Sequence, residues 1–162
     1  MSTHAPHVYK ARLLKLSTLL DGLKGSQFDY GRWCTTKVWL PLGTDLLKAK
    51  AISCGTSACA LGWAPSLPFA QRLGYKLIAT GRLTCHGVSS VFVRNGHVED
   101  GSNVARELFD VDSEEFRFLF MPIFSYHARL ADRGLVGGRL TPDASPQQVA
   151  EHIRLFVKQK YE

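Results

Sequence analysis

Residues 54–63 read Cys-Gly-Thr-Ser-Ala-Cys-Ala-Leu-Gly-Trp, and this stretch is the most informative part of the sequence. The alanines and the leucine in it favour a helix, and the hydroxyl of Thr56 or Ser57 would cap that helix by accepting a hydrogen bond from a first-turn amide. Cys54 lies just before the expected cap. Exposed amides and the positive end of the helix dipole favour a thiolate there.

The same residues also have a purely structural interpretation. Unpaired cysteines are among the most buried residue types. In this interpretation Cys54 and Cys59 are small buried apolar side chains, while Gly55 and Gly62 permit close packing. The sequence leaves both interpretations open.

Composition indicates an ordinary globular protein. The 162 residues are 45% hydrophobic and 21% charged, which is enough for one sizeable core. We therefore expect a single globular domain over residues 1–162. The first residues lack the charged start and apolar run of a secretion signal, and no apolar stretch is long enough to cross a bilayer. We expect a cytoplasmic protein with no membrane partner.

The chain contains four cysteines, Cys34, Cys54, Cys59 and Cys85. In the cytoplasm we expect them to be reduced. Together with His86 and His97 they raise the question of a zinc site. Cys54 and Cys59 are separated by four residues, however, and no Cys-x-x-Cys pair exists, so the spacing does not match a zinc-binding pattern. We predict no metal and no cofactor.

Positive charge is concentrated in the first half of the chain. The formal net charge is +6, but residues 1–81 carry ten Lys or Arg against three acids, whereas the remainder carries ten against eleven. A basic half attracts acidic partners, such as a phosphate backbone or an acidic protein surface. The alternative is a solvated surface that happens to be basic.

The clearest strand signal is a hairpin at 91–99. Two short extended runs flank Asn95-Gly96, the dipeptide that tight two-residue turns prefer. A strand is also expected at 75–79. Apolar residues recur every three or four positions from His7 to Leu23, which predicts an amphipathic helix.

Further helices are predicted at 44–52, 69–73, 102–109, 112–120 and 145–160. Capping boxes from Asp112 to Glu115 and from Ser145 to Gln148 define the starts of the last two. The predicted fold class is α+β: a mostly helical single domain with a small antiparallel sheet.

The order of several motifs resembles a family of small, uncharacterised proteins of bacteria and their phages. The motifs are Phe28–Trp33, the Cys-Gly-Thr-x-x-Cys-x-x-Gly-Trp pattern at 54–63, Leu108-Phe109 and Leu119-Phe120. The resemblance implies an intracellular, phage-associated product. Small phage proteins of this kind commonly act by binding, including as inhibitors of host enzymes or of immune systems such as CRISPR. No catalytic or binding residue is implied by it.

We therefore expect a non-enzymatic binding protein that acts on a host macromolecule. The candidate partner-binding residues combine cations with aromatic side chains in one short region: Arg32, Trp33, Lys37, Trp39, Lys48 and Lys50. Trp33 and Trp39 could instead belong to the core. A host protein or protein complex is favoured over nucleic acid because no helix-turn-helix, zinc-finger or RNP signature is present.

The alternative function is a cysteine-dependent hydrolase or transferase. Cys54 would be its nucleophile, with His86 or His97 as the base. This chemistry requires the base within hydrogen-bond reach of the thiol, a distance that the sequence does not supply.

Overall fold

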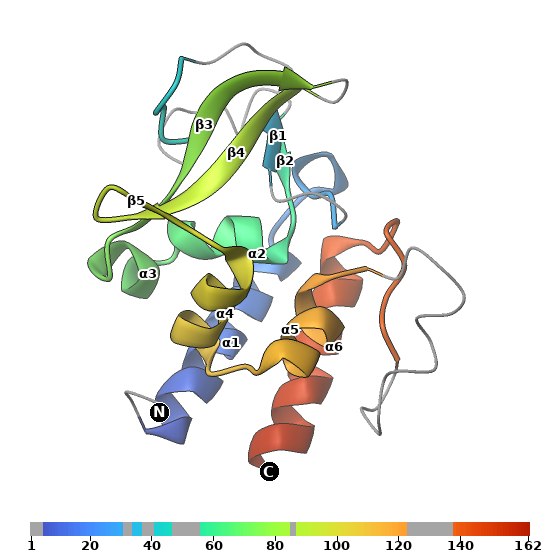
Figure 1. The fold of residues 1–162 in the computed structure, drawn as a ribbon. Coiled ribbons are helices and arrows are strands. Elements are labelled where there is room, and N and C mark those ends of the chain that lie inside the picture. The colour runs from blue at the N-terminus through green and yellow to red at the C-terminus, as the bar shows by residue number, and fades with distance from the viewer. Residues whose placement is uncertain (1–4, 31–33, 37–40, 47–55, 85–86, 123–137) are drawn as a thin grey trace.

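The computed structural model describes residues 5–30, 34–36, 41–46, 56–84, 87–122 and 138–162. Helices gather on one side of a small antiparallel sheet (Figure 1). The predicted α+β class, mostly helical with a small antiparallel sheet, is confirmed. One cluster of buried side chains draws on both the helices and the sheet.

Helices α1 (Pro6–Asp21) and α6 (Pro146–Tyr161) lie side by side, although they are the first and last elements of the chain (Figure 1). Leu13 and Leu16 of α1 and Ile153 of α6 are fully buried. Their periodicity confirms the two amphipathic helices expected from the sequence. Burial of an aliphatic side chain contributes about 1.5–3 kcal/mol, so this contact is a large part of the core.

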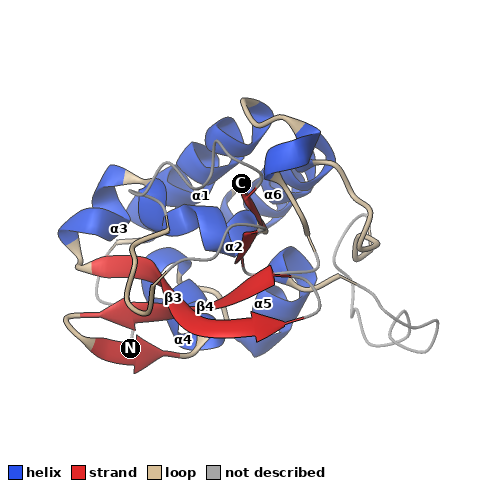
Figure 2. Ribbon diagram, turned by 90° about the horizontal axis from the view of Figure 1, so that it is seen from above, coloured by secondary structure: helices blue, strands red, loops and turns tan. Residues whose placement is uncertain are grey.

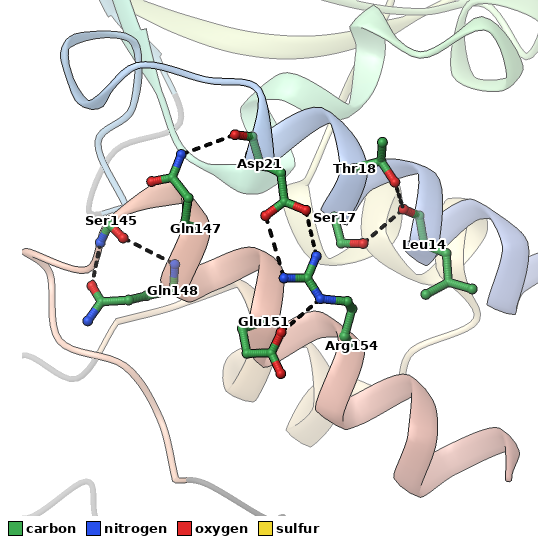
Figure 3. Close-up of polar contacts among 9 residues, drawn as sticks. All are labelled: Leu14, Ser17, Thr18, Asp21, Ser145, Gln147, Gln148, Glu151 and Arg154. Carbon is green, nitrogen blue, oxygen red and sulfur yellow. Dashed lines mark hydrogen bonds and ion pairs between the residues drawn. The ribbon is translucent and has the colours of Figure 1, made fainter.

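Polar contacts align the same two helices (Figure 3). Arg154 of α6 binds the carboxylate of Asp21 at 2.6 Å and that of Glu151 at 2.8 Å. Gln147 donates to the carbonyl of Asp21 at 3.2 Å. These charged groups are partly exposed, so each pair contributes at most about 1 kcal/mol. They fix the relative position of helices that apolar burial holds together.

Local capping starts the later helices, at Asp112 and Ser145 as the sequence predicted and also at Asp100. Asp112 caps α5 (Ser113–Phe120), and its carboxylate accepts from the amides of Glu114 and Glu115 at 2.8 and 2.9 Å. Ser145 caps α6, with its hydroxyl accepting from the Gln148 amide at 3.1 Å. Asp100 caps α4 (Gly101–Phe109). Both predicted capping boxes are confirmed.

The sheet consists of β1 (Cys34–Thr36), β2 (Thr56–Ala58), β3 (Tyr75–Thr84), β4 (Gly87–Arg94) and β5 (His97–Glu99). The order is β2-β1-β4-β3, with β5 also paired to β4, and every pair is antiparallel. Figure 2 shows the two longest strands, β3 and β4, running alongside each other. The hairpin is confirmed, since Asn95 and Gly96 have φ of 50° and 86° as its turn requires.

Buried and exposed side chains alternate along the first part of β3, so the strand has one face toward the core and one away from it. Tyr75, Leu77 and Ala79 are buried, whereas Lys76 between them is exposed. Residues 41–46 run along the outer edge of β3, where the Gly43 amide donates to the Ala79 carbonyl at 2.9 Å. These contacts hold the edge of β3 within the described part of the chain.

The helix predicted at 44–52 is wrong at its beginning. Asp45 forms a β-bridge with Ile78, and the Leu46 amide donates to the Leu77 carbonyl at 2.9 Å. Backbone hydrogen bonds to β3 therefore replace those of the predicted helix, for which Thr44 was the expected N-cap. Residues 47–52 of that prediction lie outside the described residues.

Two short helices connect β2 to β3. They are α2 (Ala60–Trp63), continued by a 3₁₀ turn at Ala64–Ser66, and α3 (Pro68–Arg72). The predicted helical turn at 69–73 is thus confirmed. Gly74 follows it with a φ of 84°, a left-handed conformation that glycine adopts without strain.

Arg12 is a buried cation that connects α1 to α4. Its guanidinium lies 5.4 Å from the ring centre of Tyr9 and 5.2 Å from that of Phe69. Its Nη1 donates to the Leu108 carbonyl at 3.1 Å, near the C-terminal end of α4. A cation is favourable there because the helix dipole leaves the carbonyl end negative.

Gly74→Ala is expected to destabilise the protein by about 1–2 kcal/mol, because an added Cβ forces an L-residue into the left-handed region. The new Cβ would also lie 2.5 Å from Oδ1 of Asn95. Urea denaturation measures the change in the free energy of unfolding. Gly25→Ala is the matched control, since its Cβ meets nothing within 4 Å. Equal stability of the two variants would contradict this account of the turn.

Candidate functional site

The segment around Cys59 is built differently from the prediction. Thr56 and Ser57 lie in β2, where they pair with Thr36 and Thr35 of β1, so neither caps a helix. The cap of α2 is Cys59, whose Sγ accepts from the Gly62 amide at 3.4 Å. The helix therefore begins later than expected. Thr56 and Ser57, which local propensity assigned to the start of the helix, instead pair with a strand that is distant in the sequence.

Cys59 carries a protonated thiol. Its side chain is buried, and burial raises the pKa to about 12, against the opposing effect of hydrogen bonds from the Gly62 and Leu61 amides. A thiol with this pKa has almost no thiolate at neutral pH, and the thiolate is the nucleophile. For Cys59 the structural interpretation of the motif is confirmed.

The same segment contacts the chain before β1. Trp63 donates from Nε1 to the Gln27 carbonyl at 3.1 Å, and the Asp29 amide donates to the Ala58 carbonyl at 3.2 Å. Tyr30 donates from its hydroxyl to the Leu119 carbonyl at 2.9 Å, and burial raises its pKa far above the usual range. We call Ala58–Trp63, Gln27–Tyr30 and Leu119 the hub.

Most of the predicted site residues lie outside the described residues. These are Arg32, Trp33, Lys37, Trp39, Lys48, Lys50, Cys54 and His86. His97 is described: it is exposed in β5, directly opposite Arg94 of β4. The distance from Cys54 to an imidazole, which decides the hydrolase alternative, is thus not among the described contacts.

The parts of the chain that adjoin the predicted binding residues are anchored in the sheet. β1 lies between Trp33 and Lys37 in the sequence and pairs with β2 and β4. Leu46, two residues before Lys48, is fully buried and bonded to β3. The structure therefore ties the described neighbours of these residues to one sheet.

A charged cluster that the sequence did not indicate joins the hairpin to α4. Glu107 accepts from Arg94 at 2.5 Å and from the Tyr75 hydroxyl at 2.8 Å, and the Arg94 guanidinium lies 5.4 Å from the Tyr75 ring centre. Burial, followed by the hydrogen bond to Glu107, raises the pKa of Tyr75. Arg94 Nε is buried and has no hydrogen bond within the described structure. No local pattern predicts this cluster, because its members come from separate elements.

Two shallow pockets occur among the described residues. The larger, of about 330 Å³, lies between the segment before β1 and the loop that leads into α6, and is lined by Gly25, Phe28, Asp29, Tyr30 and residues 142–147. The smaller, of about 260 Å³, lies beside the turn between α4 and α5. Asp143, which lines the larger pocket, has a lowered pKa because Thr141 donates a hydrogen bond to it.

Within the described ranges, no group of three or more His, Cys, Asp or Glu side chains is placed to hold a metal ion. Across the same ranges, none of the helices combines the length and apolar character needed to span a membrane. Comparison of the chain with protein-family models, curated proteins and solved structures finds no match.

Cys59 generates a prediction with a defined pH dependence. The folded thiol has a pKa of about 12 against an ordinary value of 9.0, so the folded state binds the proton more tightly. Its contribution to stability is complete below pH 9 and declines above it, by about 1.4 kcal/mol per pH unit until the folded pKa is reached.

Urea denaturation of wild type and Cys59→Ala at pH 8 and pH 10 isolates this effect, since all other titrating groups are shared. We expect Cys59→Ala to be less stable by about 1–2 kcal/mol at pH 8, from the lost cap and packing. The deficit should shrink at pH 10. A deficit independent of pH would show that the thiol is not desolvated.

Proposed function

We propose that this chain is a cytoplasmic, phage-associated, non-enzymatic binding protein that acts on a host macromolecule. The favoured target is a host protein or protein complex with an acidic surface, and nucleic acid is the second candidate. The proposed action is inhibition of a host enzyme or of a defence system, such as a CRISPR system. Binding would use Arg32, Trp33, Lys37, Trp39, Lys48 and Lys50.

The observation that carries the proposal is the excess of positive charge in residues 1–81, which hold ten Lys or Arg against three acids. Four exposed cations of this half form no ion pair with any described residue: Lys15, Lys24, Arg72 and Lys76. Asp21, one of the three acids of this half, is bound to Arg154 of the other half. Lys10 of the first half in turn binds Glu162 of the other half at 2.8 Å, so these two pairs offset each other and the positive excess of the first half is unchanged by them.

The second half of the chain provides the contrast. Arg94 pairs with Glu107, and Lys160 pairs with Glu115 at 2.7 Å. Charges there are largely balanced between neighbouring elements, in line with the near-neutral sum of the sequence. An acidic partner would therefore be attracted to the first half, through a long-range field that salt weakens.

The hub supports a binding role for the surface rather than for the motif at 54–63. Cys59 is buried and protonated, and Trp63 is almost fully buried with its indole N–H satisfied. Their roles in packing and capping account for these two residues of the motif. We therefore assign recognition to the cationic residues of the first half and not to these two residues.

The proposal predicts that reversing two cations weakens partner binding. The partner is first isolated by affinity capture from a bacterial lysate, with and without nuclease treatment to separate protein from nucleic-acid targets. The dissociation constant of the purified pair is then measured by calorimetry. Lys48→Glu with Lys50→Glu should weaken binding at least tenfold, about 1.4 kcal/mol, and rising salt should weaken wild-type binding.

The matched control is Arg117→Glu with Lys158→Glu, which produces the same change in net charge at two exposed positions of the second half. It should bind nearly as tightly as wild type. Equal loss in both double variants would mean that only total charge matters. Loss in Cys54→Ala alone would favour the cysteine-dependent enzyme instead.

A further inference from the structure

One edge of strand β5 is paired with β4, and no other described strand pairs with its opposite edge. Its pairing with β4 places His97 opposite Arg94, Val98 opposite Val93, and Glu99 opposite Phe92. In a hairpin with a two-residue turn, the residues that flank the turn form the hydrogen-bonded pair, and such pairs alternate along the ladder. Val98 therefore directs its N–H and C=O away from β4. Among the described strands, only β4 pairs with β5.

Val98 is also the most exposed of the apolar strand residues whose side chains the structure describes. Its exposed fraction is 71%, compared with 8% for Val93 opposite it. Both lie on the same face as Lys76, because cross-strand partners share a face. His97 and Glu99 flank Val98 and lie on the other face. An exposed valine with unpaired backbone groups at a sheet edge favours pairing with another strand.

We propose that β5 pairs antiparallel with β5 of a second copy of this chain, about a two-fold axis that passes beside Val98. In this register Val98 exchanges both backbone hydrogen bonds with Val98 of the partner subunit. The apolar row formed by Val93 and Val98 then continues across the axis. The two rows of two valines become one row of four, and the exposed Val98 side chains cover each other.

The flanking side chains make this edge complementary to itself. Two-fold pairing centred on Val98 places His97 opposite Glu99 of the partner subunit, and Glu99 opposite His97 of the partner subunit. Each pair sets an imidazole N–H donor against a carboxylate acceptor, and no like charges meet. The two-fold axis reverses the second strand, so the His97 end of one strand lies opposite the Glu99 end of the other. An isologous interface requires such a self-complementary surface. A second copy therefore matches this edge at every position.

The dimer should be weak, since three residues on each side bury far less than the roughly 1,200 Å² of a standard interface. It is independent of the proposed function, because none of the predicted partner-binding residues lies in β5; His97 was predicted only as a base in the alternative enzyme. Failure of either proposal leaves the other standing.

Sedimentation velocity of the full chain, from about 10 µM to about 1 mM, tests the proposal. Wild type should shift from monomer toward dimer with concentration. Val98→Lys should remain monomeric throughout, because it sets two ammonium groups opposite each other. Leu42→Lys is the control, since Leu42 is 76% exposed on the segment beside β3. It should dimerise like wild type.

A charge exchange tests the register. His97→Glu places carboxylates opposite each other in both flanking pairs and should weaken dimerisation about tenfold. Adding Glu99→Lys restores opposite charges and should recover the wild-type dissociation constant. A wild type that stays monomeric, an equal loss in Leu42→Lys, or a double variant that fails to recover would each overturn the proposal. All variants alter exposed or half-exposed positions, and circular dichroism verifies that they fold.

Discussion

The fold depends on the hub. There, Ala58–Trp63, which follows β2, is hydrogen-bonded to Gln27–Tyr30, which precedes β1. The Ala58 carbonyl accepts from the Asp29 amide, and the Trp63 indole donates to Gln27. Cys59 starts α2 between these contacts with a buried thiol as the cap. Because buried polar groups without partners cost about 1–3 kcal/mol each, these bonds must form together with the surrounding core. They join the sheet to the helical layer, and Tyr30 extends the connection to the end of α5.

Local chemistry made much of the fold predictable. Asp112, Ser145 and the Asn95-Gly96 turn act through neighbours in the sequence, so the two helix starts and the hairpin were expected and are confirmed. The errors arise where distant segments compete. Thr56 and Ser57 have the character of helix caps but pair with β1, and Asp45 bridges to Ile78 instead of entering a helix. No local pattern indicates these partners, which lie about twenty or more residues away.

The candidate site was less accessible to sequence reasoning for the same physical reason. The sequence shows which residues carry charge, but compensation depends on the fold: Asp21 meets Arg154, and Glu107 meets both Arg94 and Tyr75. The counts already show that the first half is basic, and the structure adds that four of its exposed cations, Lys15, Lys24, Arg72 and Lys76, form no ion pair with any described residue. The sequence left a reactive thiolate open at Cys54, which lies outside the described residues, and a buried thiol at Cys59. Burial within the hub confirms the second of these predictions.

Native-state hydrogen exchange at the amides of Asp29, Gly62 and Trp63 tests most directly whether the hub is architecture. These amides donate to the Ala58 carbonyl, the Cys59 sulfur and the Cys59 carbonyl, respectively. If the hub forms only with the whole core, all three should exchange by global unfolding, with opening free energies equal to that of unfolding measured in urea. Exchange through a local opening that costs several kcal/mol less would show that the fold persists without the hub, and would contradict this account.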